Sequence, residues 1–150
     1  MDLILWRHAD AEDGSPDSAR KLTAKGHKQA DEMAQWLKPR LHKDTRILVS
    51  PAVRAQQTAR ALTGEFKTVE EIAPGASYQA ILTAAGWPSH KGAVLVVGHQ
   101  PALGQAAAWL ISGDAAEWNI KKAAIWWLTH REREDQGQVV LRAVMSPELA

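Results

Sequence analysis

Three short apolar runs, each of which ends abruptly at polar residues, constrain the fold of this chain most. They are residues 3–6 (LILW), 46–49 (RILV) and 93–97 (AVLVV). A continuous apolar run, without alternation, suits a strand that is buried on both faces. Strands of this kind occur in parallel sheets covered by helices, so the runs indicate an α/β architecture.

Four segments near these runs have the pattern of helices. Thr23 is expected to cap the first, and Pro39 is expected to end it and to force Lys38 out of helical geometry. Ser50 is expected to cap the second, with Pro51 at its first helical position. The other two are expected near residues 77–85 and over residues 101–111.

The last third of the chain predicts two strands, over residues 123–129 and 139–145, joined as a hairpin by a polar turn around Gly137. Earlier in the chain, strands alternate with helices, which argues for parallel strands with helices on both faces. We therefore expect an α/β fold, a three-layer α/β/α sandwich with a mostly parallel central sheet and a C-terminal antiparallel hairpin. The length fits one domain, residues 1–150.

Charge and cysteine content exclude several classes of function. Lys and Arg number 18 against 17 Asp and Glu, and no basic run is present, so neither nucleic acid nor a membrane is an expected partner. The absence of cysteine excludes disulfides, thiolate metal sites and cysteine nucleophiles. The first apolar stretch is too short for a signal peptide or a membrane span, so we expect a cytoplasmic protein, and a monomer.

Polar residues follow each of the three apolar runs. Arg7 and His8 come after the first, Ser50 and Arg54 after the second, and His99 after the third. The carboxyl ends of parallel strands lie at one edge of a sheet, where ligands bind in α/β proteins. We expect these side chains to converge there, although each of them alone also has an ordinary structural explanation.

The position of Arg54 points to a bound anion. It falls near the first turn of its predicted helix, where free N–H groups and the helix dipole favour negative charge and disfavour a cation. Helical side chains lean toward the N-terminus, so the guanidinium can reach this region. An exposed helix arginine is the alternative explanation.

Two arginines and two histidines in one pocket indicate phosphoryl chemistry. Arginine binds phosphate in a bidentate way, and nearby cations are expected to lower the pKa of His8, which keeps its imidazole neutral and nucleophilic. Such an imidazole can attack phosphorus and form a phosphohistidine that water then hydrolyses. No cofactor or metal is required, and no histidine pair has the spacing of zinc ligands.

Four motifs within residues 3–104 together resemble those of the histidine phosphatase superfamily, which has the phosphoglycerate mutase-like fold. They are LILWRHADAE, LTAKG, SPAVRAQQT and VVGHQP. The size and the ending MSPELA resemble its small bacterial branch, the phosphohistidine phosphatases. The resemblance implies that His8 is the nucleophile, that Arg7 and Arg54 bind phosphate, and that His99 completes the pocket. It also implies a histidine phosphotransfer domain of a signalling relay as substrate and partner.

The segment DSARKLT, residues 17–23, also resembles that branch. Its Arg20 is expected to add a third cationic contact to the phosphate or the partner, a solvated loop arginine being the alternative. One departure from the family lies beside the nucleophile, where the motif usually reads R-H-G and this chain has Ala9. The extra methyl is expected to be tolerated.

A second departure concerns the general acid. Larger relatives protonate an alcohol leaving group with a carboxylate from an insertion, and this chain is too short to contain that insertion. A phosphoramidate leaves easily once its nitrogen is protonated, so a weak or absent acid favours P–N over P–O substrates. The candidates that the sequence offers for the acid are Asp10, Glu12 and Glu71.

Three other interpretations stay open at this point. The chain could be a phosphomonoesterase for a small metabolite, with the same fold and the same nucleophile. It could also be a non-catalytic phosphate-binding module, which the presence of all four pocket residues argues against. Finally, Trp87 and Trp118, in predicted loops, could contribute to a partner-binding surface, although core packing explains most of the tryptophans.

Overall fold

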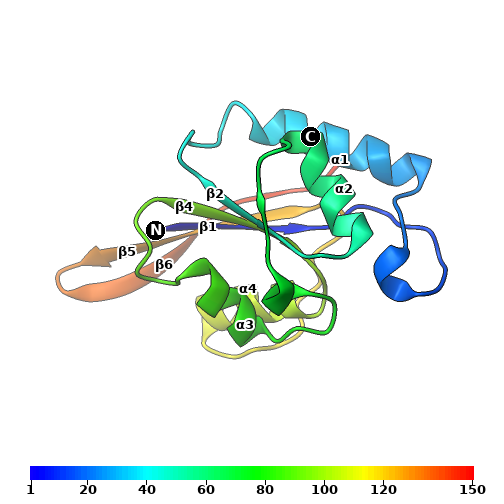
Figure 1. Cartoon of the computed structure of the whole chain (residues 1–150). Helices are drawn as coiled ribbons and strands as arrows, with labels where there is room; N and C mark the ends of the chain where they lie inside the picture. The colour runs from blue at the N-terminus through cyan, green and yellow to red at the C-terminus, as the bar shows by residue number, and fades with distance from the viewer.

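A six-stranded sheet with the strand order β3-β2-β4-β1-β5-β6 forms the centre of the molecule (Figure 1). This computed structural model describes all 150 residues. Four strands, from β3 to β1 in that order, are parallel, while β5 is antiparallel to β1 and β6 to β5. The strands are β1 (Asp2–Arg7), β2 (Arg46–Val49), β3 (Lys67–Thr68), β4 (Ala93–Gly98), β5 (Ile125–Arg133) and β6 (Gln136–Met145).

Helices cover both faces of the sheet, which confirms the predicted α/β/α sandwich. The helices α1 (Ala24–Leu37) and α2 (Val53–Leu62) lie on one face, and α3 (Tyr78–Ala85) and α4 (Ala102–Ser112) on the other (Figure 1). Successive side chains of β1 alternate between the two core layers, because Leu3 and Leu5 pack toward α3 and α4 while Ile4 and Trp6 pack toward α1 and α2. None of the helices has both the length and the apolar character that a membrane crossing requires.

The start of α2 differs from the prediction. Its first residue is Val53 and its N-cap is Ala52, so Ser50 does not cap the helix and Pro51 is not its first residue. The Ser50 hydroxyl accepts a bond from the Ala52 N–H at 3.2 Å and lies 2.7 Å from the ring of His99. The prediction failed because this serine bonds to a residue from another strand, which no local pattern reveals.

The end of α1 also differs from the prediction. Thr23 caps the helix as expected, since its hydroxyl accepts a bond from the Gly26 N–H at 2.9 Å. Lys38, however, keeps helical angles of φ −48° and ψ −50° before Pro39, so the expected departure from helical geometry was wrong. After Pro39, the N–H groups of Arg40 and Leu41 both donate to the carbonyl of Leu37. These bonds offset the preference of a residue before proline for an extended conformation.

The turn of the β5–β6 hairpin lies at Glu134 and Asp135 and not at Gly137, as had been expected. Both turn residues have positive φ, 54° and 64°, as a tight two-residue hairpin turn requires. Gly137 lies within β6, paired with Glu132, where a Cβ atom would press against the ring of His130. The glycine therefore makes room for a side chain across the ladder.

Candidate active site

The carboxyl ends of β1, β2 and β4 meet at one edge of the sheet, and a cavity of about 230 Å³ lies there. The register of the two central strands pairs Arg7 with Gly98, so His8 and His99 leave the sheet side by side. All five residues predicted to handle phosphate line this cavity. Its lining residues are Arg7, His8, Ala11, Arg20, Arg54, Pro74, Gly75, His99, Gln100 and Lys122.

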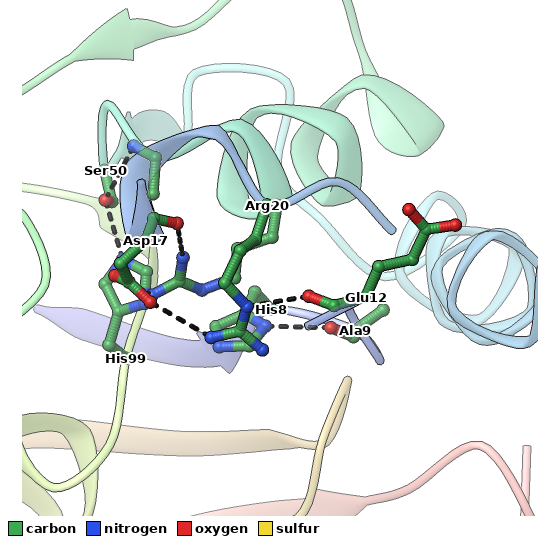
Figure 2. Close-up of polar contacts among 9 residues, drawn as sticks. His8, Ala9, Glu12, Asp17, Arg20, Ser50 and His99 are labelled. Carbon is green, nitrogen blue, oxygen red and sulfur yellow. Dashed lines mark hydrogen bonds and ion pairs between the residues drawn. The ribbon is translucent and has the colours of Figure 1, made fainter. Parts of the chain in front are cut away.

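His8 is held by backbone bonds on both sides and is only 8% exposed. Its N–H donates to the carbonyl of Gly98, and its carbonyl accepts from the N–H of Ala123, both at 3.1 Å. The ring Nδ1 lies 2.8 Å from the carbonyl of Ala9 (Figure 2). A carbonyl can only accept, so Nδ1 carries the proton in the neutral ring and Nε2 presents a lone pair.

Both site histidines are neutral at pH 7. Burial, as the largest cause, together with the positive charges of Arg54, Arg7 and Arg20, lowers the pKa of His8 to about 4, against a raising effect of the bond to Ala9. Burial also lowers the pKa of His99 to about 3, with His8 and Arg54 acting in the same direction. The predicted direction for His8 is confirmed, but burial contributes more than the neighbouring cations.

His99 faces His8 across the site. The two ring centroids are 5.1 Å apart, and the rings are tilted by 51°. The Nε2 atom of His99 lies 2.7 Å from the Ser50 hydroxyl, while its Nδ1 is buried without a partner in the protein. Ser50 thus orients the second histidine, a role that the sequence analysis missed although the residue opens the SPAVRAQQT motif.

The two central arginines are fixed by different partners. Arg7 donates from Nη1 to the carbonyl of Ile120 at 2.8 Å. Arg54, only 5% exposed, donates from Nη1 to the carbonyl of Asp17 at 2.8 Å and from Nη2 to its carboxylate at 3.1 Å. The Nε atoms of both arginines are buried and unpartnered in the protein. These donors are suited to the oxygens of a phosphoryl group.

Arg20 reaches the cavity from the loop that precedes α1. Its Nε donates to the carbonyl of Glu12 at 2.7 Å, and its Nη1 donates to the carboxylate of Asp17 at 3.0 Å (Figure 2). The loop is therefore ordered by its own hydrogen bonds. The contact between Arg20 and a phosphate or partner stays a prediction.

None of the three candidate acids lines the cavity. The carboxylate of Asp10 accepts bonds from Lys122 and from the Thr23 hydroxyl, both at 2.8 Å, and these bonds lower its pKa. Glu12 is exposed, and Glu71 lines a separate cavity beside β2, β3 and α3. The lining set contains no carboxylate, and nowhere in the structure are three His, Asp or Glu side chains placed to hold a metal ion.

Two more residues of the site escaped the sequence analysis. Lys122 lies before β5 and is 112 positions from Asp10, the residue with which it forms an ion pair. Asp17 lies in a short 3-10 helix before α1 and meets Arg54 only through the tertiary fold. Asp17 falls within the DSARKLT segment, whereas no sequence signal marks Lys122.

The chain is similar in sequence to known phosphatases. Residues 3–75 match the family model described as histidine phosphatase superfamily (branch 1). The chain is 34% identical over 127 residues to the phosphohistidine phosphatase SixA of Escherichia coli, with 76% of each chain covered. It is 35% identical over 124 residues to the SixA homolog of Haemophilus influenzae, with 72% of this chain and 76% of the relative covered.

A solved structure is similar over nearly the whole chain. It is described as the protein histidine phosphatase SixA complexed with tungstate. The TM-score is 0.81 at 28% sequence identity, and the match covers 98% of this chain and 97% of the other. The fold of this chain thus belongs to an architecture that has been solved in a histidine phosphatase carrying tungstate.

Proposed function

Because this chain belongs to the histidine phosphatase superfamily and is a phosphatase, we propose that it hydrolyses phosphohistidine, carried by a phosphotransfer signalling protein, through a phosphoenzyme on His8. The observation that carries the proposal is the state of His8. Its Nε2 holds a lone pair in a neutral ring, and it shares a cavity with Arg7, Arg54 and His99.

The reaction proceeds in two displacements at phosphorus. In the first, Nε2 of His8 attacks, the bond from phosphorus to the substrate nitrogen breaks, and the substrate imidazole leaves with a proton from solvent. In the second, water attacks the phosphoenzyme, the bond to Nε2 breaks, and inorganic phosphate and neutral His8 result. Arg7, Arg54 and His99 stabilise the charge on the phosphoryl oxygens in both steps.

The residues around the cavity favour a nitrogen leaving group over an oxygen one. An alkoxide needs a proton from a positioned acid, and no carboxylate lines this cavity. The imidazole of phosphohistidine is a far better leaving group, because its ring can take up a proton from solvent before the P–N bond breaks and then leaves as a neutral molecule. This difference supports phosphohistidine as the substrate class.

Trapping of the phosphoenzyme tests the nucleophile. The wild type and His8→Ala are incubated with phosphoramidate, and the protein is assayed for an acid-labile, alkali-stable phosphate. We expect the label on the wild type and on a control variant, His27→Ala, which alters an exposed histidine of α1. We expect His8→Ala to carry none and to lose about a thousandfold or more in kcat. Equal labelling of the wild type and His8→Ala would contradict the assignment.

A comparison of leaving groups tests the substrate class. The ratio kcat/KM for phosphoramidate should exceed that for glycerol phosphate by at least about a hundredfold, since a general acid contributes at least that factor to ester cleavage. Comparable values on the two substrates would point to a phosphomonoesterase of the same fold.

A third comparison tests whether the phosphohistidine substrate is carried by a protein. We expect kcat/KM to be higher for a phosphorylated histidine phosphotransfer domain than for free phosphohistidine, because the exposed loop of residues 12–19, next to the cavity-lining Arg20, offers a protein surface additional contacts. A value that is equal or lower for the domain would favour a small-molecule substrate.

A further inference from the structure

We propose that Asp17 is a positioning residue of the phosphate site, which couples Arg20 of the loop before α1 to the buried Arg54. This inference rests on the function proposed above and adds a residue outside the set that handles phosphate directly. Asp17 begins a short 3-10 helix (Asp17–Ala19) and is the carboxylate partner of both arginines.

Asp17 accepts four hydrogen bonds from the two arginines. Its Oδ2 accepts from Arg54 Nη2 at 3.1 Å, and its Oδ1 accepts from Arg20 Nη1 at 3.0 Å. Its backbone carbonyl accepts from Arg54 Nη1 at 2.8 Å and from the Arg20 N–H at 3.2 Å. One residue thus holds both guanidinium groups, which line the same cavity as His8 and His99; Figure 2 shows Asp17 and Arg20 beside these histidines.

The bonds to Asp17 do not use every donor of Arg54. They use Nη1 and Nη2, whereas Nε has no partner in the protein. A guanidinium that is already ordered loses little side-chain entropy when it binds phosphate. Asp17 therefore reduces the entropy cost of phosphate binding for both arginines.

The negative charge of Asp17 also stabilises the buried positive charge of Arg54. Arg54 is buried near the start of α2, where the helix dipole disfavours a cation, and the carboxylate compensates for this. Arg7, in contrast, is held by the neutral carbonyl of Ile120, and none of the ion pairs in the structure includes it. The positive charge of Arg7 is thus left for the phosphate, while Asp17 serves to place Arg54 and Arg20.

The loop is also held by bonds that do not involve the Asp17 carboxylate. The N–H of Glu12 donates to the carbonyl of Lys21 at 2.8 Å, and Ala11 and Leu22 form a β-bridge at its base. The N–H of Leu22 donates to Gln57 of α2 at 2.8 Å. A substitution that removes only the carboxylate charge therefore leaves the loop in place and reports on the arginines.

The experiment measures the binding of inorganic phosphate by calorimetry and the turnover of phosphoramidate, for Asp17→Asn, Arg20→Gln and the double variant. Asp17 is 56% exposed, so we expect Asp17→Asn to raise the Kd for phosphate and the KM about fivefold, with kcat changed less than twofold. Arg20→Gln should lose a similar factor, and the double variant little more than either single one. Asp13→Asn, in the same loop, is the matched control and should bind phosphate like the wild type.

Three results would overturn the inference. Unchanged or tighter phosphate binding by Asp17→Asn would show that the carboxylate is inert or competes with the ligand. Losses that multiply in the double variant would show that the two residues act independently. A lower melting temperature of Asp17→Asn with an unchanged Kd would show a structural role alone. A wild type that binds phosphate without turnover would contradict the proposed function instead, and the binding data would still test Asp17.

Discussion

Thr58 connects the backbone that follows His8 to the helix that carries Arg54. The Ala9 N–H donates to its hydroxyl at 3.0 Å, and the hydroxyl donates to the carbonyl of Arg54 at 2.7 Å. Thr58 is fully buried and closes the SPAVRAQQT motif. The threonine of this motif therefore links the segment after β1 to α2, in addition to its place in the helix.

Substitution of Thr58 by valine keeps the side-chain shape and removes this link. The buried N–H of Ala9 then has no acceptor, which should lower the free energy of unfolding by about 1–3 kcal/mol. Denaturant unfolding measures the loss, and kcat should fall because the segment after His8 is no longer held. Thr83→Val, on the exposed face of α3, is the control. Equal stability of Thr58→Val and the wild type would contradict the role of the bond.

Ala9 occupies the place of the usual glycine without strain. Its φ is not positive, and its methyl is buried in the core layer under α1 and α2. We expect Ala9→Gly to lower the free energy of unfolding by about 1 kcal/mol, because it removes a buried methyl and frees the unfolded backbone. The kcat for phosphoramidate should stay within about twofold, since the carbonyl that bonds His8 is retained. A large rise in kcat would mean that the methyl distorts the site.

At the scale of elements, α1 packs directly against the segment that follows His8. A Cβ atom at Gly26 would overlap the carbonyl of Asp10, so the glycine of LTAKG allows the close approach of helix and loop. Gly26→Ala gains about 1 kcal/mol of helix propensity, but the overlap should reverse this to a net loss of about 1–3 kcal/mol.

The effect of Gly26→Ala is measured by thermal unfolding and by kinetics, and both the melting temperature and kcat should fall. Gly64→Ala is the matched control, because a Cβ atom at Gly64 would meet nothing within 4 Å. If Gly26→Ala were more stable than the wild type, the helix would be free to move away from Asp10, and the packing argument would fail.

Elements that depend on local pattern were predictable from the sequence. The apolar runs became β1, β2 and β4 within a residue or two, and Thr23 caps α1 as expected. Elements that depend on distant partners were not. The role of Ser50 depends on His99, 49 positions away, and the hairpin turn uses two residues with positive φ where the sequence suggested glycine.

The same distinction applies to the site. That His8, Arg7, Arg54 and His99 line one cavity could be predicted, because they lie at or after the ends of buried strands that share one edge of the sheet. Lys122 lies in a segment without hydrophobic periodicity, so the spacing of residues could not predict that it lines the cavity. Asp17 could not be predicted as a partner of Arg54, because the two residues are 37 positions apart and meet only where the loop packs against α2.

At the scale of the whole molecule, the two neutral histidines make stability depend on pH. Their pKa values in the folded state, about 4 and about 3, lie below the ordinary value of 6.5. The unfolded chain therefore binds more protons as the pH falls below 6.5, and the folded state loses stability in that range. For His8 the loss should reach about 3 kcal/mol near pH 4.

Chemical denaturation between pH 7 and pH 4.5 measures this dependence. The wild type should lose stability steadily toward the acid side, and His8→Asn and His99→Asn should each show a flatter profile. The double variant should be flatter still. A profile of the double variant as steep as that of the wild type would assign the acid sensitivity to other groups.

The central position of β1 has a consequence for synthesis of the chain. Its two neighbours are β4, which begins at Ala93, and β5, which begins at Ile125. While the chain emerges from the ribosome, β1 has no strand to pair with until well over half of the residues have been made. The N–H that holds the carbonyl of His8 belongs to Ala123 and arrives later still. A nascent chain therefore carries His8 for most of translation without the completed pocket around it.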